Sequence, residues 1–194
     1  MDKIDSLDKI NAFVSDIRSL RKGYLTNFFL DRKKHSLWIE KGELFYVSFP
    51  DCYFLLHLTN SVNNLFFITT TSQQLAENLK AFLPIFAEQM VVDIVGDAKI
   101  VDLKDVFVEQ GFSVYEQLYR MNRIGTLEFK EIDTPNVCFA EDVDAQVVLD
   151  MLHSYFDPLS EQLPSYEEIL YFISRKSVLV YKEAGKVYGF VIFE

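Results

Sequence analysis

Hydrophobic positions in the first part of the chain change from helical to strand-like spacing. Within residues 7–20, Ile10, Phe13 and Ile17 recur at intervals of three and four, which is typical of an amphipathic helix. Beyond these residues, short β-branched and aromatic runs alternate with turn-forming residues, which predicts an antiparallel meander. The predicted strands of this meander are Leu37–Ile39, Leu44–Phe49, Tyr53–Leu58 and Leu65–Thr69.

Between residues 72 and 123 the pattern predicts helices and strands in alternation. Ser72 is suited to cap a helix that Pro84 should kink or split. The apolar run Met90–Val95 predicts a short strand, and the helix after it should end before Gly111, which suits a left-handed position. Phe112–Met121 predicts a further strand. This alternation is typical of the α/β class.

A fall in apolar density between Asn122 and Val137 marks the best candidate for a domain boundary. We therefore predict domains over residues 1–124 and 136–194, joined by a linker over 125–135. The second domain should run strand, helix, helix, strand, strand. Its predicted elements are a strand at 137–139, a helix with Val143, Val147, Met151, Leu152 and Tyr155 on one face, a helix capped by Ser165, and a hairpin turning at Glu183–Lys186.

The last nine residues, Lys186–Glu194, are apolar on both alternating faces. A strand of this kind is typical of the middle of a covered sheet. We expect the run Val187–Phe193 to be paired on both edges, by the first half of the chain or by a second copy in a homodimer. The pattern places Val187, Gly189, Val191 and Phe193 on one face and Tyr188, Phe190, Ile192 and Glu194 on the other.

Composition and charge limit the classes of partner. The chain has 194 residues and a formal net charge of -10, which argues against nucleic-acid and anionic-membrane partners because these need a basic face. The polar N-terminus lacks the pattern of a signal peptide, and no apolar run reaches the roughly 18 residues of a membrane span. These features predict a cytoplasmic protein.

Cysteine and histidine positions do not predict a metal site. Cys52 and Cys138 lie far apart in apolar stretches, which predicts two buried, reduced thiols. A catalytic thiol would need a histidine beside it in the fold, and the sequence leaves that alternative open. His35, His57 and His153 each lack a ligand-type neighbour at metal-site spacing, so we predict no metal.

Two stretches resemble the GNAT superfamily, the acetyl-CoA-dependent N-acyltransferases. The hairpin Val178–Phe193 resembles the second and third strands of that family. The run Val106–Phe112, followed by Tyr115, Leu118 and Met121, is similar to its last helix and strand. The resemblance implies an α/β fold with a mixed sheet, in which residues 1–124 form a diverged GNAT-like domain. Residues 136–194 would then be the N-terminal part of a second one.

The resemblance implies acetyl-CoA as the cofactor, held by an Arg/Gln-x-x-Gly-x-Gly/Ala loop between the fourth strand and the next helix. By element count this loop would begin just after Glu194, so we expect the 194-residue chain to be inactive and to bind acetyl-CoA poorly. The internal run Asp93–Ala98 has glycine and alanine at the right spacing, but its two carboxylates would repel a pyrophosphate. A glycine turn explains this run without a ligand.

The resemblance also implies an acceptor site for an amine, whether a small molecule or a peptide. Its wall would be the loop Phe156–Pro164, where Asp157 and Glu161 could attract a cation; the alternative is a solvated connection between two helices. A second hypothesis for the whole chain is a non-catalytic GNAT-like interaction module. The candidate wall residues are Phe156, Asp157, Glu161, Gln162 and Tyr166.

Overall fold

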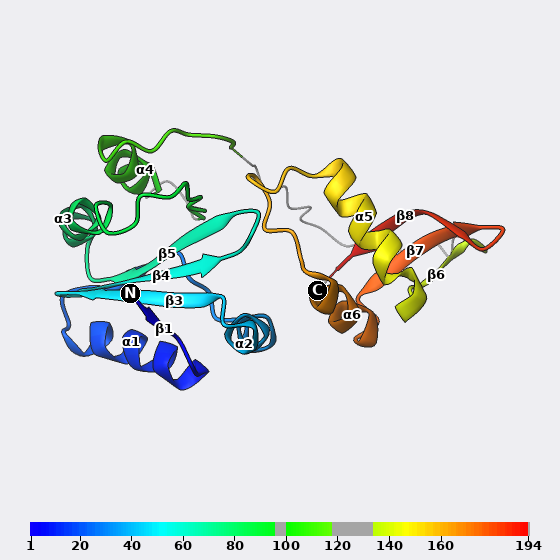
Figure 1. Ribbon diagram of the computed structural model, residues 1–194, viewed down its shortest axis with the longest axis horizontal. Helices are drawn as coiled ribbons and strands as arrows, with labels where there is room; N and C mark the ends of the chain where they lie inside the picture. Colours follow the sequence, from blue (N-terminus) through cyan, green and yellow to red (C-terminus); the bar gives the residue numbers. More distant parts are fainter. Residues whose placement is uncertain (96–99, 118–133, 194) are drawn as a thin grey trace, which may run out of the picture. The chain divides into compact units, whose positions relative to one another are not determined.

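The protein is described by a computed structural model that covers residues 1–95, 100–117 and 134–193. Its contacts divide the chain into two compact units, Met1–Val114 (unit 1) and Tyr115–Glu194 (unit 2). Both units combine helices with an antiparallel sheet, so the coarse prediction of a fold that combines helices and strands is confirmed (Figure 1). The predicted linker lies largely outside the described residues. No described helix has both the length and the apolar character that a membrane span requires.

Unit 1 is built on a five-stranded sheet with the order β1-β3-β4-β5-β2. Neighbouring strands are antiparallel, and an isolated parallel bridge joins Asn64 to Val91 at the outer side of β5. The long strands confirm three of the four predicted meander strands. The bounds are β1 Asp2–Lys3, β2 Leu25–Thr26, β3 Leu44–Phe49, β4 Cys52–Leu58 and β5 Asn63–Thr69.

Helices cover both faces of the unit 1 sheet, because its long strands are apolar on both sides. Leu55 and Phe66 face α1 (Leu7–Ser19) and α2 (Arg32–Lys41), whereas Phe54 and Phe67 face α3 (Ser72–Phe82) and α4 (Ile100–Glu109). Figure 1 shows the resulting three layers, with one helix pair on either side of β3, β4 and β5. Unit 1 therefore has two hydrophobic cores that share one sheet.

The predicted strand Leu37–Ile39 is wrong, because these residues belong to helix α2. Asp31 caps this helix by accepting hydrogen bonds from the N–H groups of Lys33 and Lys34, and Gly42 ends it at a φ of 70°. Three consecutive apolar residues favour a strand when read alone. The cap at each end and the packing of Trp38 in the core decide for a helix.

The predicted elements after β5 are confirmed only in part. Helix α3 ends at Phe82, two residues before Pro84, and Thr71 rather than Ser72 is its N-cap. Gly111 follows α4 at a φ of 91°, as predicted. The predicted strand Met90–Val95 is reduced to the bridge at Val91, because its residues otherwise pack as irregular chain. Of the predicted strand Phe112–Met121, residues 112–117 are irregular and the rest lie outside the described residues.

Unit 2 has the predicted order of strand, helix, helix, strand, strand. Its sheet has the order β6-β7-β8, with antiparallel pairing throughout. The β7–β8 turn places Ala184 and Gly185 at φ values of 48° and 78°, which is typical of a tight hairpin. The bounds are β6 Val137–Phe139, a short 3-10 helix Asp142–Asp144, α5 Ala145–Tyr155, α6 Tyr166–Ser174, β7 Val178–Glu183 and β8 Lys186–Ile192.

The core of unit 2 lies between one face of this sheet and the helices α5 and α6. The predicted inner face of α5 is confirmed only at Met151 and Leu152, whereas Val143 is 80% exposed. The buried residues of the helix are Ala145, Val148 and Leu152. Both faces of this segment carry apolar residues, so periodicity alone did not identify the inner one. Ala145 is fully buried, and its small side chain lets the face of α5 that carries Ala145, Val148 and Leu152 pack closely on the sheet.

A β-bulge changes the predicted faces of β8. Tyr181 pairs with Gly189 while Lys182 pairs with Val187, so Tyr188 is an extra residue without a partner. Val187 consequently lies on the core side with Phe190 and Ile192. The pattern had predicted Val187 on the same face as Val191. Among the described residues β8 is an edge strand paired only with β7, whereas the pattern predicted a central position.

Candidate functional site

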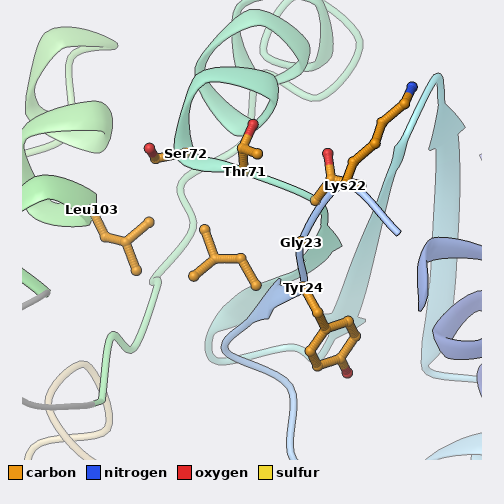
Figure 2. A pocket seen from close by; sticks show the side chains of 8 residues that line it. Lys22, Gly23, Tyr24, Thr71, Ser72 and Leu103 are labelled. Carbon is orange, nitrogen blue, oxygen red and sulfur yellow. The ribbon is translucent and has the colours of Figure 1, made fainter. Parts of the chain in front are cut away.

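A shallow hollow of about 400 Å³ lies in unit 1 where β2, the end of β5 and the start of α3 meet. Figure 2 shows Thr71 and Ser72 at the beginning of α3, with Leu103 and Lys22 at opposite sides of the hollow. One part of the lining is polar and the other is apolar. The lining residues are Lys22, Gly23, Tyr24, Leu25, Thr70, Thr71, Ser72 and Leu103.

Close backbone approach at Gly23 shapes this hollow. Gly23 has a φ of 121°, and a Cβ atom there would lie 2.6 Å from the carbonyl oxygen of Thr70. Only glycine permits this conformation and this distance. Immediately afterwards Leu25 pairs with Thr69, so the segment after α1 lies tightly against the end of β5.

The polar groups of the hollow are mostly engaged. The Thr71 hydroxyl accepts a hydrogen bond from the Gln74 N–H, and the Lys22 ammonium lies 2.7 Å from the Asp51 carboxylate. Thr70 is 5% exposed. The Asp51 carboxylate thus compensates the charge of Lys22 at this hollow.

Asn27 seals the outer side of β5 beside this hollow. Its side-chain amide donates to the carbonyl oxygens of Leu65 and Asp93 at 3.2 and 3.0 Å, and its oxygen accepts from the Phe67 N–H at 2.7 Å. Thr26 adds a bond from its hydroxyl to the Phe67 carbonyl oxygen. The backbone groups of Leu65 and Phe67 on this side of β5 are therefore already hydrogen-bonded to Thr26 and Asn27.

Two of the three histidines meet at Trp38 on the other face of the sheet. The His57 ring stacks on the indole at a centroid distance of 3.7 Å, and His35 contacts it edge-on at 4.8 Å. The Asp31 N–H donates to His35 Nδ1 at 2.9 Å. His57 Nε2 lies 3.3 Å from a Glu43 carboxylate oxygen. These contacts form a packed aromatic cluster.

Burial, with a smaller contribution from the nearby Lys34, lowers the pKa of both cluster histidines from 6.5 to about 4. The rings are thus neutral at physiological pH. Within the described residues no group of His, Cys, Asp and Glu side chains could hold a metal ion.

The predicted acceptor wall lies between α5 and α6 in unit 2. Asp157 organises this loop: its carboxylate accepts from the Leu159 N–H at 2.9 Å, and its carbonyl oxygen accepts from the Ser160 and Glu161 N–H groups. Phe156 and Tyr166 are partly exposed, whereas Glu161 and Gln162 are half-buried. The loop is therefore a hydrogen-bonded turn with an exposed carboxylate, and partly exposed aromatic rings stand at its two ends.

Tyr115 is a contact of this loop that sequence analysis missed. Its hydroxyl donates to the second carboxylate oxygen of Asp157. This bond lowers the pKa of Asp157 below its ordinary value, with a smaller contribution from the Leu159 N–H. Asp157 is thus ionised over a wide pH range and presents a negative charge to solvent.

The two cysteines have different environments. Cys52 is buried in the unit 1 core, and burial raises the pKa of its thiol to about 12. Cys138 is exposed, so its predicted burial is wrong. It lies in β6, a strand at the edge of a small sheet, and edge positions of this kind keep contact with solvent.

No protein-family model matches the chain, and no curated protein or solved structure is significantly similar to it. The geometry therefore carries the functional argument. The hollow in unit 1 was not predicted, although the run Thr69–Ser72 before an apolar helix pattern and the isolated Gly23 were visible signals. These two segments come together because β2 pairs with β5. β2 has only two residues, so its pairing is not predictable from the sequence pattern.

Proposed function

We propose that this protein is an N-acyltransferase of the GNAT type, in which unit 1 is structural and unit 2 receives the amine. The supporting observation is a structural repeat within the chain. In unit 1 the elements β1, α1, α2, β3 and β4 occur in this order, with the two-residue strand β2 between the two helices. In unit 2 the elements β6, α5, α6, β7 and β8 occur in a similar order, with a short 3-10 helix before α5. The GNAT resemblance implies this order for the start of a domain.

Strand pairing repeats together with the order of elements. β3 lies between β1 and β4, and β7 lies between β6 and β8, with antiparallel pairing in both units. In each unit the last two of these strands form a hairpin with a tight turn, at Pro50–Asp51 and at Ala184–Gly185. A duplicated domain accounts for this agreement better than two unrelated small folds.

The residues of unit 1 do not fit acetyl-CoA. The resemblance places the pyrophosphate loop between the fourth strand and the next helix. When the two-residue β2 is left out of the count, this is the connection from β5 to α3 in unit 1. Thr70 and Thr71 stand there without the glycines that let a backbone approach a pyrophosphate. Lys22 is already paired with Asp51, and Asn27 closes the adjacent side of β5. We assign no reaction step to this unit.

The loop after α5 supplies the chemistry for the acceptor. The bond from the Tyr115 hydroxyl lowers the pKa of Asp157, and Glu161 lies on the same turn. Phe156 and Tyr166, at the two ends of this loop, have partly exposed aromatic rings. A protonated amine is attracted by the carboxylates and by the faces of the rings, so the proposed acceptor is a cationic amine.

Titration with spermidine, and separately with a lysine-containing peptide, tests this acceptor site. We expect backbone amide shifts concentrated in residues 156–163 and weakened by added salt. The double variant Asp157→Asn with Glu161→Gln should lose most of this binding. The matched control is Asp150→Asn, an exposed carboxylate on α5 that hydrogen-bonds Gln146. Equal loss in the control, or shifts spread over the acidic surface, would contradict the acceptor assignment.

Calorimetry with acetyl-CoA tests the cofactor half of the proposal. We expect no tight binding by this 194-residue chain, because the β5–α3 connection lacks the glycines of the family loop. A micromolar dissociation constant would mean that the cofactor uses groups that we have judged unsuitable. Amine binding and cofactor binding are measured separately, so each half can fail alone.

A second candidate function is that of a non-catalytic GNAT-like interaction module. The observation that favours it is the edge position of β8, whose outer side has no strand partner among the described residues. Such an edge is a template for pairing with another chain. This candidate does not require a cofactor.

A further inference from the structure

Helix α5 carries a second apolar face, which the described residues leave largely exposed. Val143, Val147, Met151 and Tyr155 follow one another at intervals of four residues along the 3-10 helix and α5. Val143 and Tyr155, at the two ends of this row, are 80% and 73% exposed, and Val147 is 40% exposed. Met151 is half-buried because it also packs against the unit 2 core. These four residues form the outer ridge of α5.

The outer ridge is not needed to hold α5 in place. Ala145, Val148 and Leu152 already pack in the core of unit 2. Single exposed apolar side chains are ordinary on a protein surface, whereas a continuous row of them is typical of a contact surface. Side chains four residues apart form the ridges by which helices pack into the grooves of other helices. The spacing of the outer ridge therefore fits a helix as its occupant.

The sequence around the outer ridge is acidic without compensation. Residues 138–174 contain eight aspartates and glutamates and neither lysine nor arginine. Lys182 compensates the buried Asp144 at 2.7 Å, whereas Asp142 and Asp150 are exposed next to residues of the ridge. Specific interfaces place opposite charges across from each other. A complementary partner therefore carries lysine or arginine beside an apolar face.

The same charges argue against a second copy of this chain as the occupant. Two outer ridges that face each other about a two-fold axis bring the acids of both copies together, and like charges across an interface are unfavourable. The net charge of -10 on each chain adds to this repulsion. The charge pattern favours a different, basic polypeptide.

We propose that the outer ridge of α5 is the docking surface for an amphipathic helix of another polypeptide, with lysine or arginine along the sides of its apolar face. The apolar side chains of that helix pack on Val143, Val147 and Tyr155. Its cations lie against Asp142 and Asp150. The attraction between the charges selects a basic partner, and burial of the ridge supplies most of the affinity.

The position of the ridge connects it with the proposed acceptor site. α5 ends at Tyr155, directly before the loop that carries Asp157 and Glu161, so a helix docked on α5 ends next to this loop. A basic polypeptide is then the class of substrate that brings a lysine amine to these carboxylates. This assignment of the substrate rests on the proposed function, whereas the docking itself requires no reaction.

Titration of the isotope-labelled whole chain with a helical peptide tests the docking surface. The probe consists of two Leu-Lys-Lys-Leu-Leu-Lys-Leu repeats, which place leucine on one helix face and lysine on the other. We expect backbone amide shifts concentrated in residues 142–155, and weaker binding at high salt. The control peptide has glutamate in place of every lysine and should not bind.

A double variant tests the ridge itself. Val143→Ser together with Val147→Ser should raise the dissociation constant of the lysine peptide at least about 10-fold, because two apolar side chains no longer pack against it. Val108→Ser, at an exposed valine of α4, is the matched control and should leave the affinity unchanged. All three valines are exposed, so the circular dichroism spectrum should not change in either variant.

Absence of binding by the lysine peptide, equal binding of the glutamate peptide, or equal affinity of the double variant and the wild type would each overturn the docking proposal. Self-association of the wild type that the double variant abolishes would also overturn it, by making a second copy the occupant. Spermidine binding at residues 156–163 without peptide binding at α5 would remove only the polypeptide substrate. Peptide binding at α5 without amine binding at that loop would support the docking surface and contradict the acceptor site.

Discussion

Units 1 and 2 share the order strand, helix, helix, strand, strand, apart from the two-residue β2 between the helices of unit 1, but they complete their sheets differently. In unit 1, β5 pairs with β4, and α3 and α4 cover the second face. In unit 2 the described elements stop after β8, and the second face is open. A similar order of elements therefore gives a three-layer structure in one case and a two-layer structure in the other.

This difference shows which contacts make a strand central. β4 and β8 are both apolar on two faces, yet only β4 has a layer on each side. Sequence pattern indicates what a strand can bury, whereas the neighbouring elements decide what it does bury. A shared topology with unequal coverage predicts that equal substitutions have unequal effects in the two units.

The largest expected effect comes from removing a phenylalanine from each sheet. Phe67 is fully buried in unit 1, so Phe67→Ala should cost about 3 to 5 kcal/mol. Phe139 lies on the open face of unit 2, so Phe139→Ala should cost less than about 0.5 kcal/mol at concentrations too low for association. Urea denaturation followed by circular dichroism measures both changes. Similar costs would contradict the difference in coverage.

Acid should destabilise unit 1 through its two buried histidines. Their pKa is about 4 in the fold and 6.5 when exposed, so between these values the unfolded chain binds more protons. The free energy of unfolding should therefore fall from pH 6.5 to pH 4, by about 3 kcal/mol per ring. Trp38, the only tryptophan and the partner of His57, reports the transition by fluorescence.

His57→Phe keeps an aromatic ring against Trp38 but removes one titrating group. It should reduce the slope of stability against pH in this window by about half. His153→Phe, at an exposed position of unit 2, should leave the slope unchanged. An unchanged slope in His57→Phe would show that acid acts on other groups.

A smaller effect is expected at the sealed side of β5. Asn27→Leu keeps about the size of the side chain but removes the amide that donates to the Leu65 and Asp93 carbonyl oxygens. These carbonyl oxygens then lose a partner, at a cost of about 2 kcal/mol. The midpoint of urea denaturation should fall with an unchanged slope. The exposed Asn11→Leu is the control, and an equal fall there would contradict the role of Asn27.

The smallest expected effect is one in which the two units agree. Ser165 caps α6 and Thr71 caps α3, each through a hydroxyl that accepts a backbone N–H. Replacing either by alanine should cost about 1 kcal/mol. Caps are local, so the coverage of the sheet should not matter. Thermal denaturation of the two variants checks this, and a clearly larger cost in one unit would show that its cap has a tertiary role.

The long elements with clear periodicity were predictable from sequence. The spacing of Ile10, Phe13 and Ile17 fixes α1, and the capping box of Ser165 with Glu168 marks α6. Errors arose where an apolar run was compatible with more than one structure. Residues 37–39 read as a strand until the caps at Asp31 and Gly42 are considered. The bulge at Tyr188 changes which side chains of β8 face the core, and the apolar pattern carries no signal of it.

The candidate sites were less predictable because they depend on contacts between distant residues. Asp157 was selected by the resemblance, but its bond to Tyr115 joins residues 42 positions apart. The hollow of unit 1 depends on Gly23 lying against Thr70. His35 and His57 appear isolated in sequence and meet only because α2 packs across β4. Tertiary contacts of this kind have no local sequence pattern.

Amide hydrogen exchange in β4 and β8 of the whole chain tests whether the two sheets are completed unequally. β4 is paired on both sides, so its protection should be high. Protection of β8 should be lower, because among the described residues it pairs with β7 alone. Equal protection of β4 and β8 would contradict the account.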